Sequence, residues 1–453
     1  MIERIVRILV LALAAVALIS APAAAGESVP ADLTTTEVSI PTADGKTLMG
    51  TVYAPRNAPG AKPGLVLVHG SGNGKRTGLL PEAIAFARQG IAVLTYDKRP
   101  LDNPVYSLLA DDVVAAVGVL REQPGVRPDA VGLWGISEGG WVMPLAADRS
   151  KDIAFLVLAS APGLSPLRVQ NWNMRNKLAG AGVSGALADT LSDRFYRLAD
   201  DAGLFAEASF DPRPALSALT QPVLAVYGTE DTQVPAAESG AVLQQMIRTP
   251  LTVRFLPGAG HTLRVLDEDG MYTDELYPAY AETVGSWVRT AGTLTPRVDP
   301  APTQPATSAS LAPSAWWESW PAQLTALAVF LIGFLSYPVV ALVRRARRRT
   351  VAVARPARIL AAAGVTAVIG FVAYFVTVAD SANWKGISPG PMLAGRPVFW
   401  LALQALALIT VITTAMTIHG WRTAGADRVR QAILIVPGIL FLPWALYWGL
   451  LLP

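Results

Sequence analysis

Ser137 stands at the centre of a pattern that can make a serine hydroxyl reactive. It lies in Gly135-Ile136-Ser137-Glu138-Gly139, directly after the apolar run Val131–Trp134 and directly before Trp141–Leu145. This order predicts a strand, a sharp turn and a helix. A serine in such a turn takes strained backbone angles, and its hydroxyl stands clear of the sheet edge. The pattern therefore predicts that Ser137 is a nucleophile that attacks a carbonyl group.

Ser137 needs a base to remove its proton and a third group to orient that base. Histidine occurs only three times in the chain, so the candidates for the base are few. His261 follows Pro257-Gly258-Ala259-Gly260, just beyond the last predicted strand, and is the predicted base. Asp231 follows another apolar run and is the predicted acid, with Glu230 as the alternative. The other interpretation of either carboxylate is a helix cap or a turn residue.

A second glycine-rich loop follows an early predicted strand. It reads Val68-His69-Gly70-Ser71-Gly72. Backbone N–H groups in such a loop can point at an anion. We expect this loop to supply half of an oxyanion hole, the set of donors that stabilises a tetrahedral intermediate. We expect His69 to be a packing or hydrogen-bonding residue of the loop, and not a proton shuttle.

The elements that would position these residues form one α/β domain over residues 33–290. Near-continuous apolar strands predict a mostly parallel sheet that is buried on both faces. The predicted strands are an antiparallel hairpin of Glu37–Pro41 and Thr47–Tyr53, then Gly64–Val68, Ile91–Tyr96, Ala130–Trp134, Ile153–Ala159, Pro222–Tyr227 and Leu251–Leu256. The predicted helices are Glu82–Gln89, Tyr106–Glu122, Trp141–Ala147, Ala236–Met246 and Asp274–Arg289.

Residues 162–221 separate two of these strands, which is too long for a simple crossover. Helical patterns at Val169–Ala179 and Leu187–Leu198 predict a small helical cap over the sheet edge. The alternative is a packed surface excursion that has no role in substrate choice.

The N-terminus has the layout of a secretory signal peptide over residues 1–25. Arg4 and Arg7 precede the apolar run Ile8–Ile19, and Ala21-Pro22-Ala23-Ala24-Ala25 provides small residues for cleavage. An uncleaved membrane anchor is the alternative, although the apolar run is short for a span.

The C-terminal third predicts membrane helices. Residues 292–315 are rich in Pro, Thr, Ser and Ala and predict an extended, poorly ordered linker. The chain has 52% apolar residues and a mean hydropathy of +0.39, which favours membrane segments. Four stretches within residues 316–453 are each long enough to cross a bilayer and predict an all-α transmembrane bundle. They are Leu324–Val343, Ile359–Ala379, Val398–Ile418 and Ala432–Leu452.

Loop charges predict the orientation of these spans. The first loop holds seven arginines and the third holds three, whereas the middle loop has only Lys385 and Arg396. The positive-inside rule then places the first and third loops in the cytoplasm. We therefore expect a multi-pass protein of the cell membrane with an extracytoplasmic catalytic domain. Because the spans hold almost no ionisable residue, we expect an anchoring or partner-binding bundle and not a pore.

Charged residues near the predicted site have two interpretations. Asp97, Lys98 and Arg99 follow a strand at the predicted active edge. They either bind an anionic substrate or form internal ion pairs that hold the loop. We expect Asp111 and Asp112 on a solvated helix face, and not in a metal site.

Composition excludes several classes of function. The chain has no cysteine, which excludes disulfides, thiolate nucleophiles and cysteine metal sites. It has no phosphate loop, nucleotide fingerprint or metal-ligand spacing, so we expect neither a cofactor nor a metal. The pI of 9.1 reflects 12 basic and 3 acidic residues from Trp316 onward, against 25 basic and 31 acidic residues before it. This charge belongs to membrane loops and does not indicate nucleic-acid binding.

The order Ser, Asp, His and the motifs around these residues resemble the α/β-hydrolase superfamily. The matching motifs over residues 35–290 are the elbow at Ser137, Gly-x-x-Asp-x-x-Val-Pro at Gly228–Pro235, and Gly260-His261. His69–Gly72 and Tyr96–Arg99 are similar to the dienelactone-hydrolase-like and acyl-CoA-thioesterase-like branches. The dienelactone enzymes proper use a cysteine nucleophile, which this chain lacks. The resemblance implies that the oxyanion donors are the backbone N–H groups of Glu138 and of Ser71 or Gly70.

These observations favour a membrane-tethered serine hydrolase that cleaves a carboxylic ester or thioester through an acyl-enzyme. Its expected substrate is a small or lipid-like acyl compound. An acyltransferase or a peptidase with the same triad is one alternative. Another is a non-catalytic membrane protein that binds or assembles with a partner, and a protein partner of the bundle remains open.

Overall fold

A computed structural model describes residues 29–56, 59–101, 103, 105–268, 271–290, 295–304, 306–349, 354–382, 386–422, 424 and 427–453. The predicted signal peptide at residues 1–25 lies outside the described residues. The described chain divides into two compact units. We call residues 29–173 and 206–310 the sheet unit, and residues 174–205 and 311–453 the helical unit.

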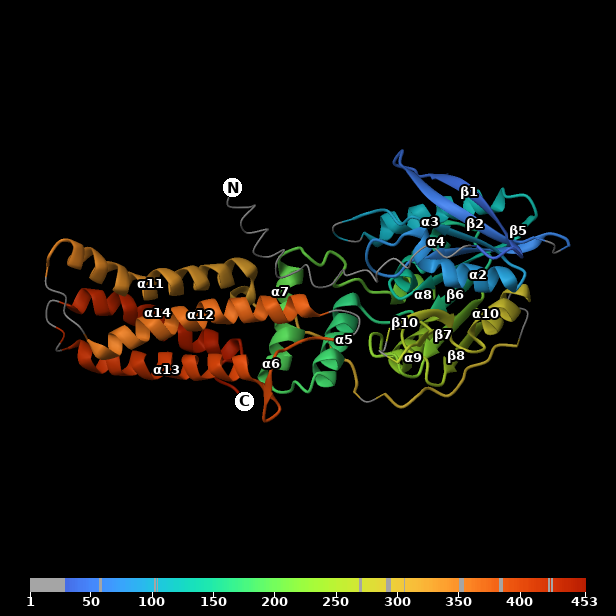
Figure 1. Ribbon diagram of the computed structural model, residues 1–453. Coiled ribbons are helices and arrows are strands. Elements are labelled where there is room, and N and C mark those ends of the chain that lie inside the picture. The colour runs from blue at the N-terminus through green and yellow to red at the C-terminus, as the bar shows by residue number, and fades with distance from the viewer. Residues whose placement is uncertain are drawn as a thin grey trace. The chain divides into compact units, whose positions relative to one another are not determined.

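The sheet unit is built on an eight-stranded sheet (Figure 1). The pairs β1–β2 and β2–β4 are antiparallel, and all the other neighbours are parallel. In spatial order the strands are β1 (Leu33–Pro41), β2 (Thr47–Pro55), β4 (Ala92–Tyr96), β3 (Lys62–Val68), β5 (Val126–Ile136), β6 (Leu156–Ala159), β7 (Val223–Gly228) and β8 (Leu251–Leu256). All eight strands predicted from the apolar runs are confirmed.

Helices cover both faces of this sheet because both faces of its strands are apolar. In β3, Val66 and Val68 join the core on one face, and Leu65 and Leu67 join the core on the other. The first core packs under α3 (Tyr106–Arg121), α4 (Gly139–Arg149) and α9 (Ala236–Met246). The second core packs under α2 (Leu80–Arg88) and α10 (Tyr280–Arg289). The sheet unit also contains the short helices η2 (Arg76–Leu79) and α8 (Arg213–Ser217).

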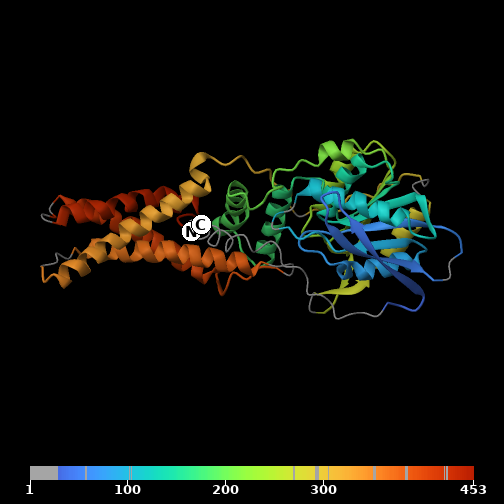
Figure 2. The ribbon, with the colours of Figure 1, turned by 90° about the horizontal axis from the view of Figure 1, so that it is seen from above.

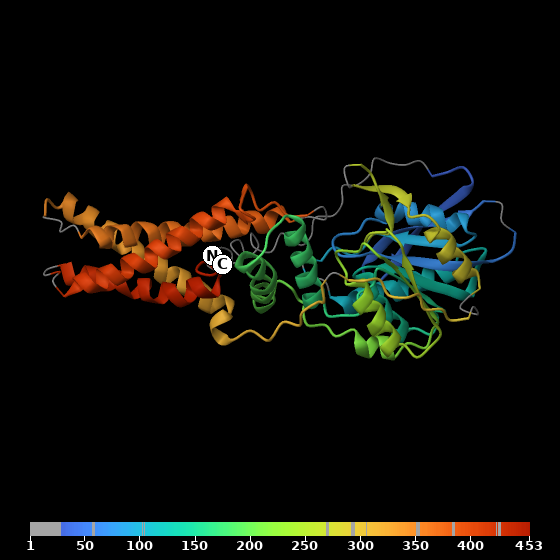
Figure 3. The ribbon, with the colours of Figure 1, turned by 90° about the horizontal axis from the view of Figure 1, so that it is seen from below.

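The prediction of a helix from Asp274 is wrong at its start. Residues 272–276 form strand β10 (Tyr272–Leu276), which pairs with β9 (Arg264–Leu266) in a small antiparallel hairpin, and α10 begins only at Tyr280 (Figure 3). Apolar periodicity holds only from Tyr280 onward, where Val284, Trp287 and Val288 face the core.

The described part of the helical unit contains four long helices that lie side by side (Figure 2). Each is long and apolar enough to cross a membrane. They are α11 (Trp320–Ala346), α12 (Arg355–Ser381), α13 (Val398–Trp421) and α14 (Arg428–Tyr447). A 3₁₀ turn, η4 (Trp316–Glu318), precedes the first, and β11 (Met392–Leu393) with β12 (Arg396–Pro397) forms a short hairpin before the third.

The predicted helices of the 162–221 insertion are present as α5 (Pro166–Gly180), α6 (Ala186–Asp189), the π turn η3 (Thr190–Arg194) and α7 (Phe195–Asp201). Residues 174–205 of this insertion belong to the helical unit. Thr190 Oγ1 donates to Trp448 O at 2.9 Å, and the Phe195 and Phe375 rings lie 5.7 Å apart. The insertion therefore packs against the membrane-type helices, a partner that helical periodicity cannot predict.

The prediction of a poorly ordered linker is wrong for part of residues 292–315. Val298 forms a parallel bridge with Val253 beside β8, and the Asp299 carboxylate accepts a hydrogen bond from Arg254 Nε at 2.8 Å. Further along, Ser308 donates through both N–H and Oγ to Glu238 of α9. These side-chain bonds hold the extended chain on the sheet unit, which the composition of the linker does not reveal.

Candidate active site

Ser137 occupies the strained turn that the sequence predicts. Its φ angle is +53°, in the left-handed region that non-glycine residues rarely enter. The backbone N–H of Ser137 donates to Ala159 O of the neighbouring strand at 3.0 Å, and α4 begins two residues later at Gly139. A Cβ at Gly139 would lie 2.9 Å from Val68 O, so only glycine lets α4 pass this close to β3. The turn therefore holds Ser137 above the end of β5.

The predicted acid and base contact each other. His261 Nδ1 lies 2.8 Å from Asp231 Oδ2. The other oxygen, Oδ1, accepts the N–H groups of Gln233 and Val234 at 2.8 and 2.9 Å, which fixes the plane of the carboxylate. The Asp231 side chain is fully buried, and that of His261 is 8% exposed. Glu230, the alternative acid, is exposed, and it is Asp231 that reaches the imidazole.

Gly228 lets the loop of His261 lie directly on the end of β7. A Cβ at Gly228 would come within 2.1 Å of Ala259 O and 2.5 Å of Gly260 O. Two further bonds join the loops, from Glu230 N to Ala259 O and from Gly258 N to Thr229 Oγ1. The acid loop and the histidine loop are thus one hydrogen-bonded body.

The parallel strands place Ser137, Asp231 and His261 at the same edge of the sheet. Ser137 follows β5, Asp231 follows β7 and His261 follows β8, so all three stand at the carboxyl ends of parallel strands. Within the described part of the chain, no hydrogen bond joins Ser137 Oγ to His261. Catalytic hydrogen bonds often form only when substrate is bound. The positions of the three residues on the parallel strands are therefore better evidence for a shared site than this hydrogen bond.

The glycine loop after β3 lies against Ser137. A Cβ at Gly70 would stand 3.4 Å from the Cβ of Ser137, so this loop borders the nucleophile. Among the described residues, no acceptor takes the backbone N–H of Gly70, Ser71 or Glu138. Unpaired N–H groups beside a nucleophile are what an oxyanion hole requires.

His69 is a structural residue of that loop. Its ring is buried, and Nε2 donates to Tyr96 O at 2.9 Å. The backbone of Gly74 lies close against this ring, because a Cβ at Gly74 would be 2.4 Å from it. Burial lowers the pKa of His69 to about 4, so the ring stays neutral near pH 7.

The charged residues after β4 form internal ion pairs. Lys98 Nζ lies 2.6 Å from Glu138 Oε1 and donates to Gly70 O at 2.8 Å, with both side chains buried. Arg99 contacts Asp112 Oδ1 at 2.6 Å and Asp44 Oδ2 at 2.5 Å. Of the two interpretations, the structure supports ion pairs that hold the loop.

The expectation of a solvated Asp112 is wrong. Asp112 is 1% exposed and forms a two-oxygen contact with Arg99, whereas Asp111 is exposed and pairs with Arg149. Leu109, Val113 and Ala116 share the buried face of α3 with it, and this spacing is the signal that could have revealed its burial.

The β9–β10 hairpin supplies two residues that sequence reasoning missed. Tyr277 follows β10, and its hydroxyl donates to Pro257 O at the base of the histidine loop. Tyr272 of β10 lies near Asp231, and burial raises the pKa of its phenol. Both tyrosines brace the loop of His261. Among the described residues, no group of three or more acidic or histidine side chains could hold a metal ion.

Comparisons with known proteins match part of this chain. Residues 108–282 match the prolyl oligopeptidase family. A thiohydrolase, aneE, of Aspergillus aculeatus is 34% identical over 132 residues, which is 27% of this chain and 41% of that protein. The chain therefore matches less than half the length of this relative.

Solved structures also match part of this chain. The structure of DcsB with its substrate analogue has a TM-score of 0.43 at 20% identity, over 58% of this chain and all of that one. The Pyrococcus furiosus esterase Pf2001 has a TM-score of 0.42 at 18% identity, over 60% of this chain and 97% of that one. The dienelactone hydrolase of Anabaena variabilis has a TM-score of 0.37 at 17% identity, over 57% of this chain and 96% of that one. The mostly parallel sheet, the left-handed turn at Ser137 and the match of residues 108–282 to the prolyl oligopeptidase family together support a hydrolase of the serine type.

Proposed function

We propose that this protein is a membrane-attached serine hydrolase that cleaves a carboxylic ester or thioester with Ser137, His261 and Asp231. The observation that carries this proposal is the left-handed turn at Ser137, on the same sheet edge as the Asp231–His261 hydrogen bond. Each of the three residues stands at the carboxyl end of a parallel strand, where open α/β sheets bind their ligands.

In the proposed reaction, Ser137 Oγ attacks the carbonyl carbon while His261 Nε2 takes the hydroxyl proton. Asp231 accepts the hydrogen bond from Nδ1–H and stabilises the charged imidazolium. The tetrahedral oxyanion accepts hydrogen bonds from Glu138 N–H and from Gly70 or Ser71 N–H. Its collapse expels an alcohol or thiol, which receives the proton from His261. Water then attacks the acyl-enzyme by the same route and releases the free acid.

An acyl ester or thioester is the favoured substrate class. The thiohydrolase name of the Aspergillus aculeatus relative supports a thioester. The apolar helices support a lipid-like acyl substrate, because they would hold the protein at a bilayer. A peptidase is the second candidate, since residues 108–282 match the prolyl oligopeptidase family and amide hydrolysis uses the same triad.

We also propose that the catalytic domain faces outward from the cell membrane. The two connections rich in arginine then face the cytoplasm. An outward site would meet lipid or envelope acceptors, so acyl transfer to an alcohol or amine remains an alternative second step.

The decisive test uses the full-length chain in detergent micelles or nanodiscs. Residues 174–205 pack on the membrane-type helices, so removal of those helices would expose apolar side chains of the insertion. A fluorophosphonate should label Ser137, and the protein should hydrolyse matched acyl esters and thioesters faster than the peptide amide. Ser137→Ala should abolish both labelling and turnover.

Three results would contradict the proposal. Turnover of Ser137→Ala at the wild-type rate would exclude this nucleophile. Faster cleavage of the amide would favour the peptidase. Acyl-ligand binding without turnover would favour a non-catalytic role, and mass spectrometry of products with added alcohols or amines separates transfer from hydrolysis.

A further inference from the structure

A cavity of about 700 Å³ lies between α11 and α12, at the end of the helical unit that carries the arginine-rich connection. Its space comes from small side chains, because Ala341 of α11 and Ala361 and Ala362 of α12 line it. Among the described residues, the lining comprises Leu335, Tyr337, Pro338, Ala341, Leu342, Arg345, Arg358, Ala361, Ala362, Val365, Thr366 and Arg430.

The lining changes from cationic to apolar along the helix axes. Arg345 and Arg358 border the cavity where α11 ends and α12 begins. From Arg345 to Leu335, the wall runs about 15 Å along α11 at 1.5 Å per residue. Apart from Tyr337, the wall residues of α11 beyond Arg345 are aliphatic. A ligand that matches this wall has an anionic end and an apolar body.

Arg430, which lines the cavity, belongs to a cluster of charged residues. The Arg430 guanidinium lies over the Tyr337 ring, 3.5 Å from its centroid, and donates to Tyr337 O at 2.9 Å. Asp427 pairs with Arg430 at 3.3 Å and also lies 3.9 Å from Arg344. One carboxylate therefore faces two arginines here, and none of the described residues that line the cavity is acidic. The cavity carries a net positive charge.

The apolar wall opens sideways to the outside of the bundle. Leu342 is 69% exposed and Leu335 is 42% exposed. On a helix that crosses a membrane, such exposed leucines face lipid chains. The cavity is therefore accessible from a bilayer and not only from water.

We propose that this cavity binds an anionic phospholipid, with its phosphate between Arg345 and Arg358 and the start of its acyl chains along Leu335 and Leu342. Guanidinium groups bind phosphate through paired hydrogen bonds, and basic pockets between membrane helices suit anionic headgroups. This site is separate from the hydrolase chemistry and does not depend on it.

The test measures lipid retention by native mass spectrometry of the full-length chain released from nanodiscs. The nanodiscs contain a phosphatidylglycerol and a phosphatidylcholine with identical acyl chains. Wild-type protein should retain phosphatidylglycerol preferentially. The double variant Arg345→Gln/Arg358→Gln should lower this preference about tenfold or more, because two cationic partners of the phosphate are lost. The matched control Arg347→Gln/Arg349→Gln removes the same charge from the connection between the two helices, outside the cavity lining, and should retain the preference within about twofold.

A steric variant separates the cavity from general surface charge. Ala362→Leu keeps every arginine but places a larger side chain in the cavity, and should reduce retention as well. It also tests the proposal if the double variant fails to fold. Equal effects of the two charge variants, no effect of Ala362→Leu, or equal retention of the two lipids would each overturn the proposal. Displacement of the lipid by millimolar glycerol phosphate would show a site for soluble phosphate and would also overturn it.

Discussion

The ammonium group of Lys98 lies 2.6 Å from the carboxylate of Glu138, the residue directly after the proposed nucleophile. The same ammonium donates to Gly70 O in the loop on the other side of Ser137. Lys98 therefore ties together the two segments that would supply the oxyanion donors. The Lys98 and Glu138 side chains are only 8% and 5% exposed, so solvent does little to weaken this contact.

Lys98→Met should lower both stability and catalysis. Loss of one partner leaves the Glu138 carboxylate buried and unpaired, which costs about 3–5 kcal/mol of unfolding free energy. If Lys98 positions the oxyanion donors, kcat should fall about 100-fold or more while KM changes little. The double variant Lys98→Met/Glu138→Met should recover most of the stability without recovering kcat. Recovery of kcat in the double variant would show that Lys98 acts only on stability.

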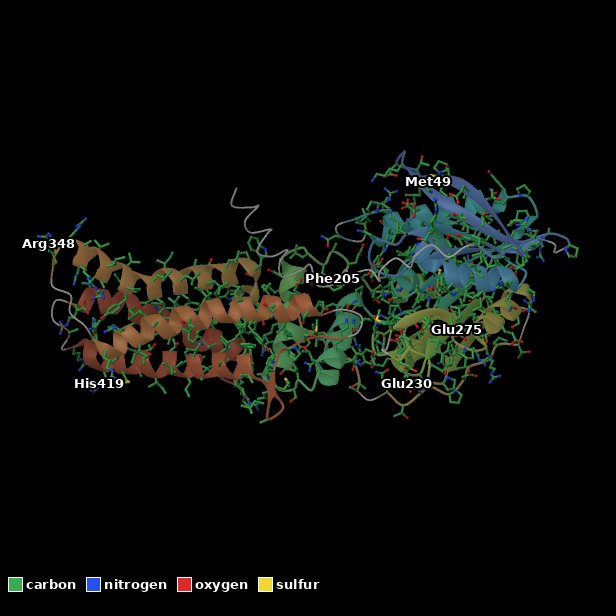
Figure 4. The ribbon with its side chains drawn as sticks, in the orientation of Figure 1. Met49, Phe205, Glu230, Glu275, Arg348 and His419 are labelled. Atoms are coloured by element: carbon green, nitrogen blue, oxygen red, sulfur yellow. The ribbon has the colours of Figure 1, made fainter. Side chains whose placement is uncertain are left out.

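Asp231→Asn should lower kcat by roughly 10⁴-fold, because an amide cannot stabilise the imidazolium and favours the wrong tautomer. The matched control is Glu230→Gln, which changes the adjacent carboxylate in the same way. Glu230 is exposed, and Figure 4 labels it in the sheet unit. Initial rates with a short acyl ester give the comparison. A larger loss of kcat in Glu230→Gln than in Asp231→Asn would make Glu230 the catalytic acid in place of Asp231.

Gly228→Ala should displace the histidine loop. The added Cβ would lie 2.1 Å from Ala259 O, so the backbone before His261 must move. A shift of about 1 Å in a catalytic group costs about 100-fold in rate. The control is Gly118→Ala in α3, where a Cβ meets nothing within 4 Å. That control should keep full activity and gain up to about 1 kcal/mol of stability. Equal activity of the two variants would contradict the close contact.

His69 should make the sheet unit less stable in mild acid. Its pKa is about 4 in the folded protein, below its usual 6.5, because burial disfavours the charged ring. Lys98 lowers this pKa further, and Asp97 opposes the shift. As pH falls below 6.5, His69 binds a proton in the unfolded chain but stays neutral in the folded chain. The unfolding free energy should therefore fall by about 3 kcal/mol between pH 6.5 and pH 4.

Denaturant titrations across this pH range test the role of His69. His69→Gln retains a donor for Tyr96 O but does not titrate. The unfolding free energy of this variant should depend less on pH than that of the wild-type protein. The difference in slope should be that of one proton, up to about 1.4 kcal/mol per pH unit. An unchanged slope would assign the acid sensitivity to other groups.

Much of this fold could be predicted because its signals are local. The apolar runs mark the strands, the glycines mark the elbow, and the order of Ser137, Asp231 and His261 follows from the strands that they terminate. Lys98–Glu138 is different. The two residues are 40 positions apart, so only the register of β4, β3 and β5 brings them together. Sequence reasoning could name Lys98 but not its partner.

The parts that could not be predicted depend on non-local packing. Strand β9 has only three residues, which is too short to show the alternation of apolar and polar residues that marks a strand. Its pairing with β10 therefore gave no signal in the sequence. The apolar side chains of α7 indicate burial but not the surface that buries them. Phe195 packs on Phe375 of α12, about 180 residues along the chain, and such contacts follow from the tertiary fold.

The helical unit itself constrains membrane topology. Figure 4 shows Arg348 and His419 at one end of this unit and Phe205 at the other. The insertion also contacts the C-terminus, because Ala186 N donates to Pro453 O at 3.0 Å. An even number of spans returns the chain to its starting side. The insertion, the start of α11 and Pro453 should therefore share one side of the membrane, and the arginine-rich connection should face the other.

Reporter fusions test this orientation. A reporter that is active only in the cytoplasm should be silent after Pro453 and active when inserted at Arg348, in the connection between α11 and α12. The positive-inside rule gives the direction, since this connection and its two flanking helix ends hold seven arginines. Both fusions should retain ester hydrolysis, which shows that the helical unit has formed. A strong signal after Pro453, with Arg344–Arg349 accessible only from outside, would reverse the orientation. The catalytic domain would then face the cytoplasm, and its proposed substrates would have to come from there.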